Sequence, residues 1–276
     1  MKSREHHTDV VRATAIDAAA AAGALIRSSF RKSIVVDHVG EHDLKLRLDR
    51  EAEEVIFSVV RKKFASDAIF SEEAGYLPGE DPYVWIADPL DGTVNYYHGI
   101  PLCCTCVSCH ALSENRAAGG YVLPDGRAAG DALAAVVYCP LSDELFVGAA
   151  GHGAALNGSP LRSVPLASIS EAIVSLSLNA RDDSISFMGK LMPRIAAQAR
   201  KVRSLGSTGL EIVFVAAGRT GAFIQLGTNL WDFAAAACIL KEAGGTIDAR
   251  EFAPGRWKVV ASNQGITEEI RKLAEL

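Results

Sequence analysis

The chain has 276 residues, and its 28 Lys and Arg against 33 Asp and Glu give a formal net charge of -5 at pH 7. Hydrophobic residues make up 49% and charged residues 22% of the chain, which is ordinary globular composition and excludes a disordered or fibrous protein. An acidic excess without a basic run argues against binding to nucleic acid by neutralisation of phosphates.

We expect no secretory signal at the start of the chain. The most apolar stretch there, residues 18–26, is bounded by Asp17 and Arg27 and is shorter than the roughly 18 residues that a membrane span needs. Residues 1–7 are too mixed in charge for the basic region of a secretory signal. We therefore expect a cytoplasmic protein that does not contact a membrane.

The first half of the chain is predicted to begin with two helices. An Ala-rich segment without Pro predicts a long helix over residues 7–31. Apolar residues on one helical face predict a second helix over 49–64, with Asp49 at its N-cap. Short strands are then predicted at 68–71, 83–87, 102–111, 136–138 and 145–147, the last two forming a hairpin. Residues 113–131 are expected to form a loop or a small protruding hairpin.

In the second half, helices and strands alternate, which predicts a layered α/β unit. Strands are predicted at residues 172–177, 202–205, 221–226, 246–248 and 259–262. Helices are predicted at 184–199, with a kink or break at Pro193, and at 209–217, 231–243 and 266–276. A boundary near 148–158 divides the chain into an α+β half, 1–150, and an α/β half, 151–276.

Four of the six cysteines lie in one short segment, in which Cys106 and Cys109 have the C-x-x-C spacing of a zinc-ligand pair. The segment is predicted to be a strand, so Cys104 and Cys106 face one side while Cys103 and Cys109 face the other. Ligands on opposite faces cannot converge, and no second pair of this spacing follows. We expect buried free thiols, with a zinc site as the alternative.

The pattern that most clearly indicates a functional site is at residues 86–101, IADPLDGTVNYYHGIP. A strand runs into Asp88, and Asp91 follows across a turn in which Pro89 restricts the backbone and Gly92 permits close approach. Two carboxylates at one point repel each other unless a cation lies between them, and Mg²⁺ prefers such oxygen ligands. The N–H groups after Asp91 suit a phosphate oxygen. The segment predicts a metal and phosphate site; the alternative is a purely structural turn.

DPLDGT followed by NYYHGIP resembles the signature of the inositol monophosphatase family of Mg²⁺-dependent, Li⁺-inhibited phosphatases. Further blocks of the family pattern occur in the right order along the chain: SEEAG at 71–75 precedes this segment, and GSTGLEIVFVAAGR at 206–219 and LWDFAAAACILKEAGG at 230–245 come after it. The resemblance spans nearly the whole chain. It implies a mixed α+β and α/β fold, a layered αβαβα sandwich, and a homodimer.

The resemblance also implies a role for individual residues. Two or three Mg²⁺ ions would be held by Glu72, Asp88, the carbonyl of Leu90, Asp91 and Asp232. Thr93, Asp49 and Glu72 would be catalytic, with Thr93 and Asp49 orienting and deprotonating the attacking water. The substrate would contact Asp91, Gly92, Thr93, Gly206, Ser207, Gln225 and Asp232. The cations would lower the pKa of the water and offset the charge that develops on the phosphate.

Several of these residues also have a plain structural interpretation. Asp49 can serve only as a helix cap, and Asp232 is favourable near a helix N-terminus with or without a metal. Glu73 is expected to support the site or to lie on the surface, and Trp231 is expected to pack in the core. The G-x-G at 151–153 lacks the third glycine of a dinucleotide-binding loop.

The substrate rim departs from the family pattern. Gln225 stands where inositol phosphatases carry a Glu that contacts inositol hydroxyls, and His38 aligns loosely with the active-site lysine. Ser207 and Thr208 occupy positions that face the substrate in relatives, and the 113–131 segment is longer than usual. Inositol monophosphate is the expected small-molecule substrate; histidinol phosphate, fructose 1,6-bisphosphate, 3'-phosphoadenosine phosphate and NADP are alternatives.

Basic residues near the pocket would favour a bisphosphate or nucleotide substrate, and Arg181, Arg203 and Lys258 are the candidates. A further alternative is a binding or regulatory protein, since some bacterial members of the family act as assembly partners around RNA polymerase.

Overall fold

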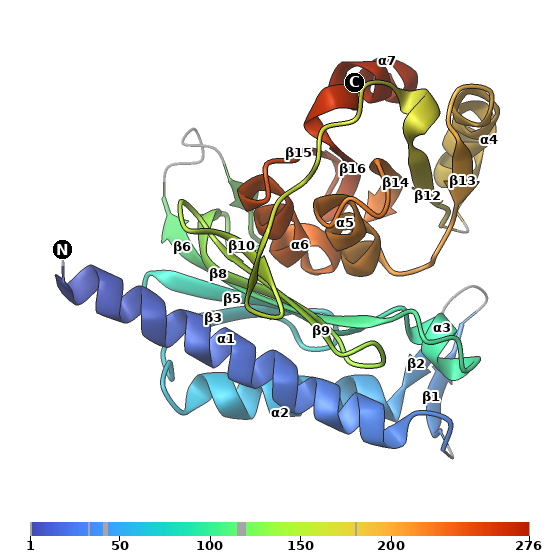
Figure 1. Ribbon diagram of the computed structural model, residues 1–276. Helices are drawn as coiled ribbons and strands as arrows, with labels where there is room; N and C mark the ends of the chain where they lie inside the picture. Colours follow the sequence, from blue (N-terminus) through green and yellow to red (C-terminus); the bar gives the residue numbers. More distant parts are fainter. Residues whose placement is uncertain (1, 33, 41–43, 115–119, 180, 276) are drawn as a thin grey trace.

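The computed structural model describes residues 2–32, 34–40, 44–114, 120–179 and 181–275. Figure 1 shows its layers: a pair of helices, a large sheet, a second pair of helices, a smaller sheet and an outer helical layer. This arrangement confirms the predicted αβαβα sandwich. No helix among these residues combines the length and apolar character that a membrane span requires.

The first layer consists of α1 (Lys2–Ser29) and α2 (Arg47–Arg61), and both helices confirm the predictions. The buried face of α2 includes Ile56 and Val60, which pack against the large sheet together with α1. The prediction that Asp49 is the N-cap of α2 is wrong. Leu46 is the N-cap, and Asp49 lies three residues inside the helix, where its carboxylate accepts a hydrogen bond from the Leu46 N–H.

The large sheet contains nine strands when it is counted over the described residues, in the order β11-β10-β9-β8-β6-β5-β3-β4, with β7 paired to β8. Its first strands are β3 (Ala68–Ser71), β4 (Gly75–Leu77), β5 (Tyr83–Asp91) and β6 (Cys104–Ser113). The others are β7 (Tyr121–Val122), β8 (Ala128–Cys139), β9 (Glu144–Ala149), β10 (Gly153–Leu156) and β11 (Ser159–Leu161). A separate ribbon pairs β1 (Val36–Val39) with β2 (Leu44–Leu46).

The two faces of β6 belong to different cores, as its alternation predicts. Cys104 and Cys106 pack in the core that includes α5 and α6, whereas Cys103 and Cys109 pack against α1 and α2. All six cysteines are free thiols. Within the 113–131 segment, β7 and the start of β8 form a small hairpin, and residues 115–119 lie outside the described part of the chain.

The middle layer consists of α5 (Thr208–Ala216) and α6 (Leu230–Glu242), which are buried between the two sheets. The smaller sheet has the order β13-β12-β14-β16-β15 over the residues that the structure describes. Its strands are β12 (Ile173–Ser177), β13 (Lys201–Arg203), β14 (Ala222–Thr228), β15 (Thr246–Ala253) and β16 (Arg256–Ser262). The predicted halves, 1–150 and 151–276, pack together. Strands β10 and β11 of the second half extend the large sheet, and α5 and α6 share a core with that sheet.

The outer layer consists of α4 (Asp182–Ala196) and α7 (Thr267–Ala274), which pack on the smaller sheet. The predicted break at Pro193 does not occur, because α4 continues to Ala196. Proline removes the hydrogen bond to the carbonyl of Gly189, and that residue is exposed, so water can satisfy the carbonyl.

Candidate metal and phosphate site

Glu72 follows the last residue of β3, and Asp88 follows the last residue of β5 that pairs with β3. Ser71 of β3 pairs with Ala87 of β5. Glu72 and Asp88 are the next residues of the two chain segments, so they lie side by side. Burial raises the pKa of Glu72 to about 8, and the nearby carboxylates of Asp232, Asp49 and Glu73 add to the shift. Asp88 is only 2% exposed, and burial, followed by Glu72 and Asp91, raises its pKa as well.

A β-bulge brings Asp88 and Asp91 to one face of the sheet. Residues three apart in a regular strand point to opposite faces. Here Asp88 pairs with Cys106 and Asp91 pairs with Cys104, and the register shifts between the two pairs. Their partners are two residues apart on β6, so both carboxylates lie on the face that α5 and α6 cover.

The carboxylate of Asp91 contacts the N-terminus of α5. Its Oδ2 accepts hydrogen bonds from Ser207 Oγ at 2.7 Å and from the Gly209 N–H at 2.6 Å, and Oδ1 accepts one from the Thr208 N–H at 3.1 Å. Burial raises the pKa of Asp91, with Cys104 and Asp232 adding to it, while the bonds from Ser207 and Gly209 lower it. Ser207, predicted to face the substrate, therefore bonds Asp91.

Asp232 occupies the first turn of α6, three residues after the N-cap Asn229. Its Oδ2 accepts hydrogen bonds from Thr228 Oγ1 at 2.7 Å and from the Asn229 N–H at 2.8 Å. Burial raises its pKa to about 6 despite these bonds. Among the described residues no hydrogen bond reaches Oδ1, so the capping role uses only one of its two oxygens.

Asp49 and Thr93 face each other beside the carboxylates. Thr93 Oγ1 lies 3.5 Å from Asp49 Oδ1 and 2.9 Å from the carbonyl oxygen of Leu90, at the start of α3 (Thr93–Tyr97). Burial raises the pKa of Asp49 to about 7. Gly92 precedes the helix with φ +94°, and a Cβ atom there would lie 2.7 Å from the carbonyl oxygen of Leu102, so only glycine fits.

Two further charged residues at the site were missed by sequence reasoning. Lys45 of β2 forms an ion pair with Glu73 at 2.7 Å, and it lowers the pKa of both Glu72 and Asp49. Glu53 of α2 accepts hydrogen bonds from the N–H groups of Glu73 and Ala74 and thereby holds the turn after β3.

Their sequence signals are weak, because Lys45 lies in a three-residue strand and Glu53 in an ordinary amphipathic helix. His38, which the resemblance assigned to the lysine position, is exposed on β1 and pairs with Lys45 across the ribbon.

Gln225, predicted to contact the substrate, is buried and hydrogen-bonded on both sides of its amide. It is 4% exposed, its Oε1 accepts a hydrogen bond from Thr208 Oγ1 at 2.7 Å, and its Nε2 lies 3.3 Å from Asn179 Oδ1. Gly206, another predicted substrate contact, has φ +76° and packs against the amide of Asn95.

Of the basic residues named from the sequence, Lys258 lies away from this site. Lys258 donates to the carbonyl of Ala274 and lies over the ring of Phe187, between α4 and α7. Arg203 donates to the carbonyl of its own neighbour, Val202, and is exposed together with Arg181.

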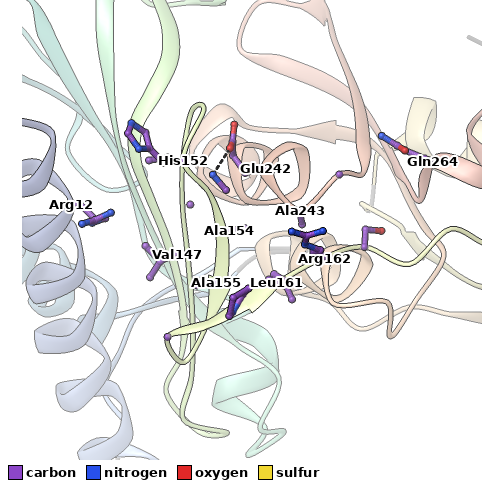
Figure 2. Close-up of a pocket in the computed structure, with 17 residues that line it drawn as sticks. Arg12, Val147, His152, Ala154, Ala155, Leu161, Arg162, Glu242, Ala243 and Gln264 are labelled. Carbon is purple, nitrogen blue, oxygen red and sulfur yellow. Dashed lines mark hydrogen bonds between the residues drawn. The ribbon is translucent and has the colours of Figure 1, made fainter. Parts of the chain in front are cut away.

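A separate pocket of about 650 Å³ lies between the β10–β11 hairpin and the end of α6 (Figure 2). The pocket is lined by charged and polar side chains that include Arg12, His152, Arg162 and Glu242. It contains none of the four residues of the acidic cluster, which are Glu72, Asp88, Asp91 and Asp232. Glu242 accepts hydrogen bonds from the N–H groups of Gly151 and Gly153. Both glycine N–H groups of the G-x-G segment therefore donate to Glu242 and are not free to bind a phosphate. This agrees with the prediction that the segment is not a dinucleotide-binding loop.

The chemistry of the cluster fits Mg²⁺. Its donors are carboxylate and carbonyl oxygens, which are the ligands that this ion prefers. Among the described residues no hydrogen bond reaches the Glu72 carboxylate, although burial and three other carboxylates act on it. Such carboxylates share a buried site at a low energy only when protons or cations reduce their charge.

Comparison with known proteins agrees with this geometry. A profile described as the inositol monophosphatase family matches residues 7–122 and 127–275. The chain is 30% identical to Inositol monophosphatase 1 of Solanum lycopersicum over 272 residues, which cover 95% of this chain and 93% of the relative. It is 34% identical to Nus factor SuhB of Pseudomonas aeruginosa over 242 residues, which cover 84% and 83% of the two chains.

Solved structures show the same fold. The extragenic suppressor protein suhB of Bartonella henselae superposes with a TM-score of 0.82 at 25% identity, covering 95% of this chain and 97% of that one. An inositol monophosphatase from Anabaena superposes with a TM-score of 0.77 at 28% identity, covering 97% and 96%.

Proposed function

The chain belongs to the inositol monophosphatase family, and from this premise we propose that it is a Mg²⁺-dependent hydrolase of small phosphate monoesters. The observation that carries the proposal is the meeting of Glu72, Asp88, Asp91 and Asp232 at the ends of β3, β5 and α6. Burial raises the pKa of each of these carboxyl groups, although Lys45, which pairs with Glu73, lowers the pKa of Glu72. Additional positive charge would therefore stabilise these groups in their ionised form.

Mg²⁺ bound among these four carboxylates and the Leu90 carbonyl would supply that charge and offset the charge of the phosphate. The residues of the chain would position the reactants. Asp49 would accept a proton from a water that is hydrogen-bonded to Thr93 Oγ1, because a carboxyl pKa of about 7 suits a general base at neutral pH. The backbone N–H groups of Gly92 and Thr93 would donate to the phosphate oxygens.

For the substrate we propose a small hydroxylated phosphate ester, with inositol monophosphate as the first to test. Gln225 is the reason to test substrates other than inositol monophosphate. Its side chain is uncharged and is hydrogen-bonded to Thr208 and Asn179, whereas the family pattern has a carboxylate at this position. Histidinol phosphate, fructose 1,6-bisphosphate, 3'-phosphoadenosine phosphate and NADP complete the panel. The position of Lys258, away from the cluster, removes one of the cations that would have favoured a bisphosphate.

The decisive experiment measures phosphate release from this panel with Mg²⁺, with and without Li⁺. We expect Asp91→Asn and Glu72→Gln each to lower kcat/KM by at least about 100-fold, as the loss of electrostatic stabilisation at a catalytic site does. Asp17→Asn, an exposed aspartate of α1, is the matched control and should retain activity. Full activity of both site variants would overturn the proposal, and melting temperatures establish that they are folded.

A role as a binding protein is the second candidate, favoured by the relative named Nus factor SuhB. A protein partner captured in one-to-one ratio by both the wild-type chain and Asp88→Ala would support it, because that variant lacks a residue of the acidic cluster. The proposed homodimer is tested separately by light scattering on the purified chain.

A further inference from the structure

Two thiols lie directly beside the carboxylate of Asp91. The strand β6 places Cys104 and Cys106 next to Asp91 and Asp88 in the ladder with β5, and the two side chains share a face. Cys104 Sγ lies 3.8 Å from Cys106 Sγ and 3.5 Å from Asp91 Oδ2. One ligating atom from each of these three residues lies within 4.8 Å of the other two.

These spacings are those of a tetrahedral metal site. With Zn–S bonds of about 2.3 Å and Zn–O bonds of about 2.0 Å, tetrahedral angles place two sulfurs about 3.8 Å apart and a sulfur and an oxygen about 3.5 Å apart. Both distances match those at Cys104. The geometry at Cys104 therefore suits a bound metal ion.

A glycine leaves room for the three atoms to face one point. Gly209, the second residue of α5, lies against them, and a Cβ atom there would lie 2.5 Å from Cys106 Sγ, 3.1 Å from Cys104 Sγ and 3.3 Å from Asp91 Oδ2. Both thiols are buried, with 0% and 1% exposure, whereas Asp91 is only partly buried. An ion could therefore approach the sulfurs past Asp91, from the side of the acidic cluster.

We propose that Asp91, Cys104 and Cys106 form a binding site for a thiophilic divalent cation of the zinc and cadmium class, adjoining the site proposed for Mg²⁺. Thiolates are soft ligands that bind zinc-like ions strongly, whereas Mg²⁺ prefers oxygen. Each thiol releases its proton to the solvent as its sulfur bonds to the ion. An ion held there engages Asp91, and so occupies a carboxylate that the Mg²⁺ site also needs.

The test is a titration of the chelator-treated, full-length protein with Cd²⁺ alone, followed by the ultraviolet thiolate-to-cadmium absorption band and by calorimetry. We expect one equivalent to bind with this band, and excess Mg²⁺ not to abolish it. Cys104→Ser and Cys106→Ser should each weaken binding by about 100-fold or more, since even supporting residues of metal sites contribute 10–100-fold.

Cys109→Ser is the matched control, because it changes a buried cysteine of the same strand on the opposite face. Its Cd²⁺ binding should equal that of the wild-type chain. Binding that is unchanged in both Cys104→Ser and Cys106→Ser, or lost equally in Cys109→Ser, would overturn the proposal. If the Ser variants melt early, the Ala variants replace them. No substrate is present, so a failure here is distinct from a lack of phosphatase activity.

Discussion

At the scale of single residues, the carboxylates of the acidic cluster differ in how many hydrogen bonds they accept. Lys45 lies on one side of it and pairs with Glu73, while Glu72 accepts no hydrogen bond within the described residues. Asp91 and Asp232, by contrast, are held by the first turns of α5 and α6. The site is thus positioned by helix N-termini but not neutralised by basic side chains, which is the arrangement expected where cations bind.

Gly92 provides a test at this scale. Gly92→Ala forces a side chain into a left-handed backbone and against the Leu102 carbonyl, so it should cost more than the 1–2 kcal/mol or so of left-handed strain alone. Gly151→Ala is the control, because its φ of +75° is similar but nothing lies within 4 Å of the added Cβ. Urea unfolding of both variants measures the difference, and equal losses of stability would show that the predicted clash is absent.

At the scale of elements, the segment before α5 is held by a buried carboxyl group. Glu211 is fully buried, and its Oε1 accepts hydrogen bonds from Ser175 Oγ and from the Leu205 N–H at 3.0 Å. Burial raises the pKa of Glu211, and its Oε2 is without a partner among the described residues. One side chain of α5 thereby ties the smaller sheet to the turn that carries Ser207 and contacts Asp91.

We expect Glu211→Ala to destabilise the protein by about 1–3 kcal/mol, because it leaves the buried Ser175 hydroxyl and the half-buried Leu205 N–H without their acceptor. Glu211→Gln keeps an acceptor oxygen and removes the buried charge, so it should recover most of the loss. Unfolding in urea at pH 7.5 compares the two. If Gln is as damaging as Ala, the carboxylate charge rather than its hydrogen bonds holds the segment.

At the scale of the whole molecule, the buried acids link stability to pH and to metal. The pKa values of Glu72, Asp49 and Asp232 are raised to about 8, 7 and 6, above the usual values near 4. The folded chain therefore binds more protons than the unfolded chain up to about pH 8, and its stability without metal should fall as the pH rises through this window.

The window to measure is pH 6.5 to 8. Buried His110, whose pKa is lowered to about 4 by burial, has the opposite effect, but only below its usual value of about 6.5. The melting temperature in chelator should fall between pH 6.5 and 8, and Mg²⁺ should restore it by replacing the protons. Glu72→Gln should flatten the profile. A melting temperature in chelator that rises with pH would contradict this assignment of the protons.

Much of this molecule was predictable from local patterns in the amino-acid sequence. Local patterns identified the main helices and strands, the opposite faces of Cys104 and Cys109, and the acidic turn at Asp88 and Asp91. These features depend on residues close together in the chain, where the helix and strand periods set the direction of side chains. The resemblance carried by the DPLDGT segment extended the prediction to the layered fold, which the solved structures of relatives confirm.

Which side chains lie together depends on the packing of the whole chain. The bulge in β5 turns Asp91 to the face of Asp88, and the register with β6 sets Cys104 beside it. Packing buries Gln225 behind Thr208, and pairing of β1 with β2 leaves His38 exposed while Lys45 reaches the acids. Each of these contacts joins segments whose register is set by the packing of the whole fold, so no local pattern contains it.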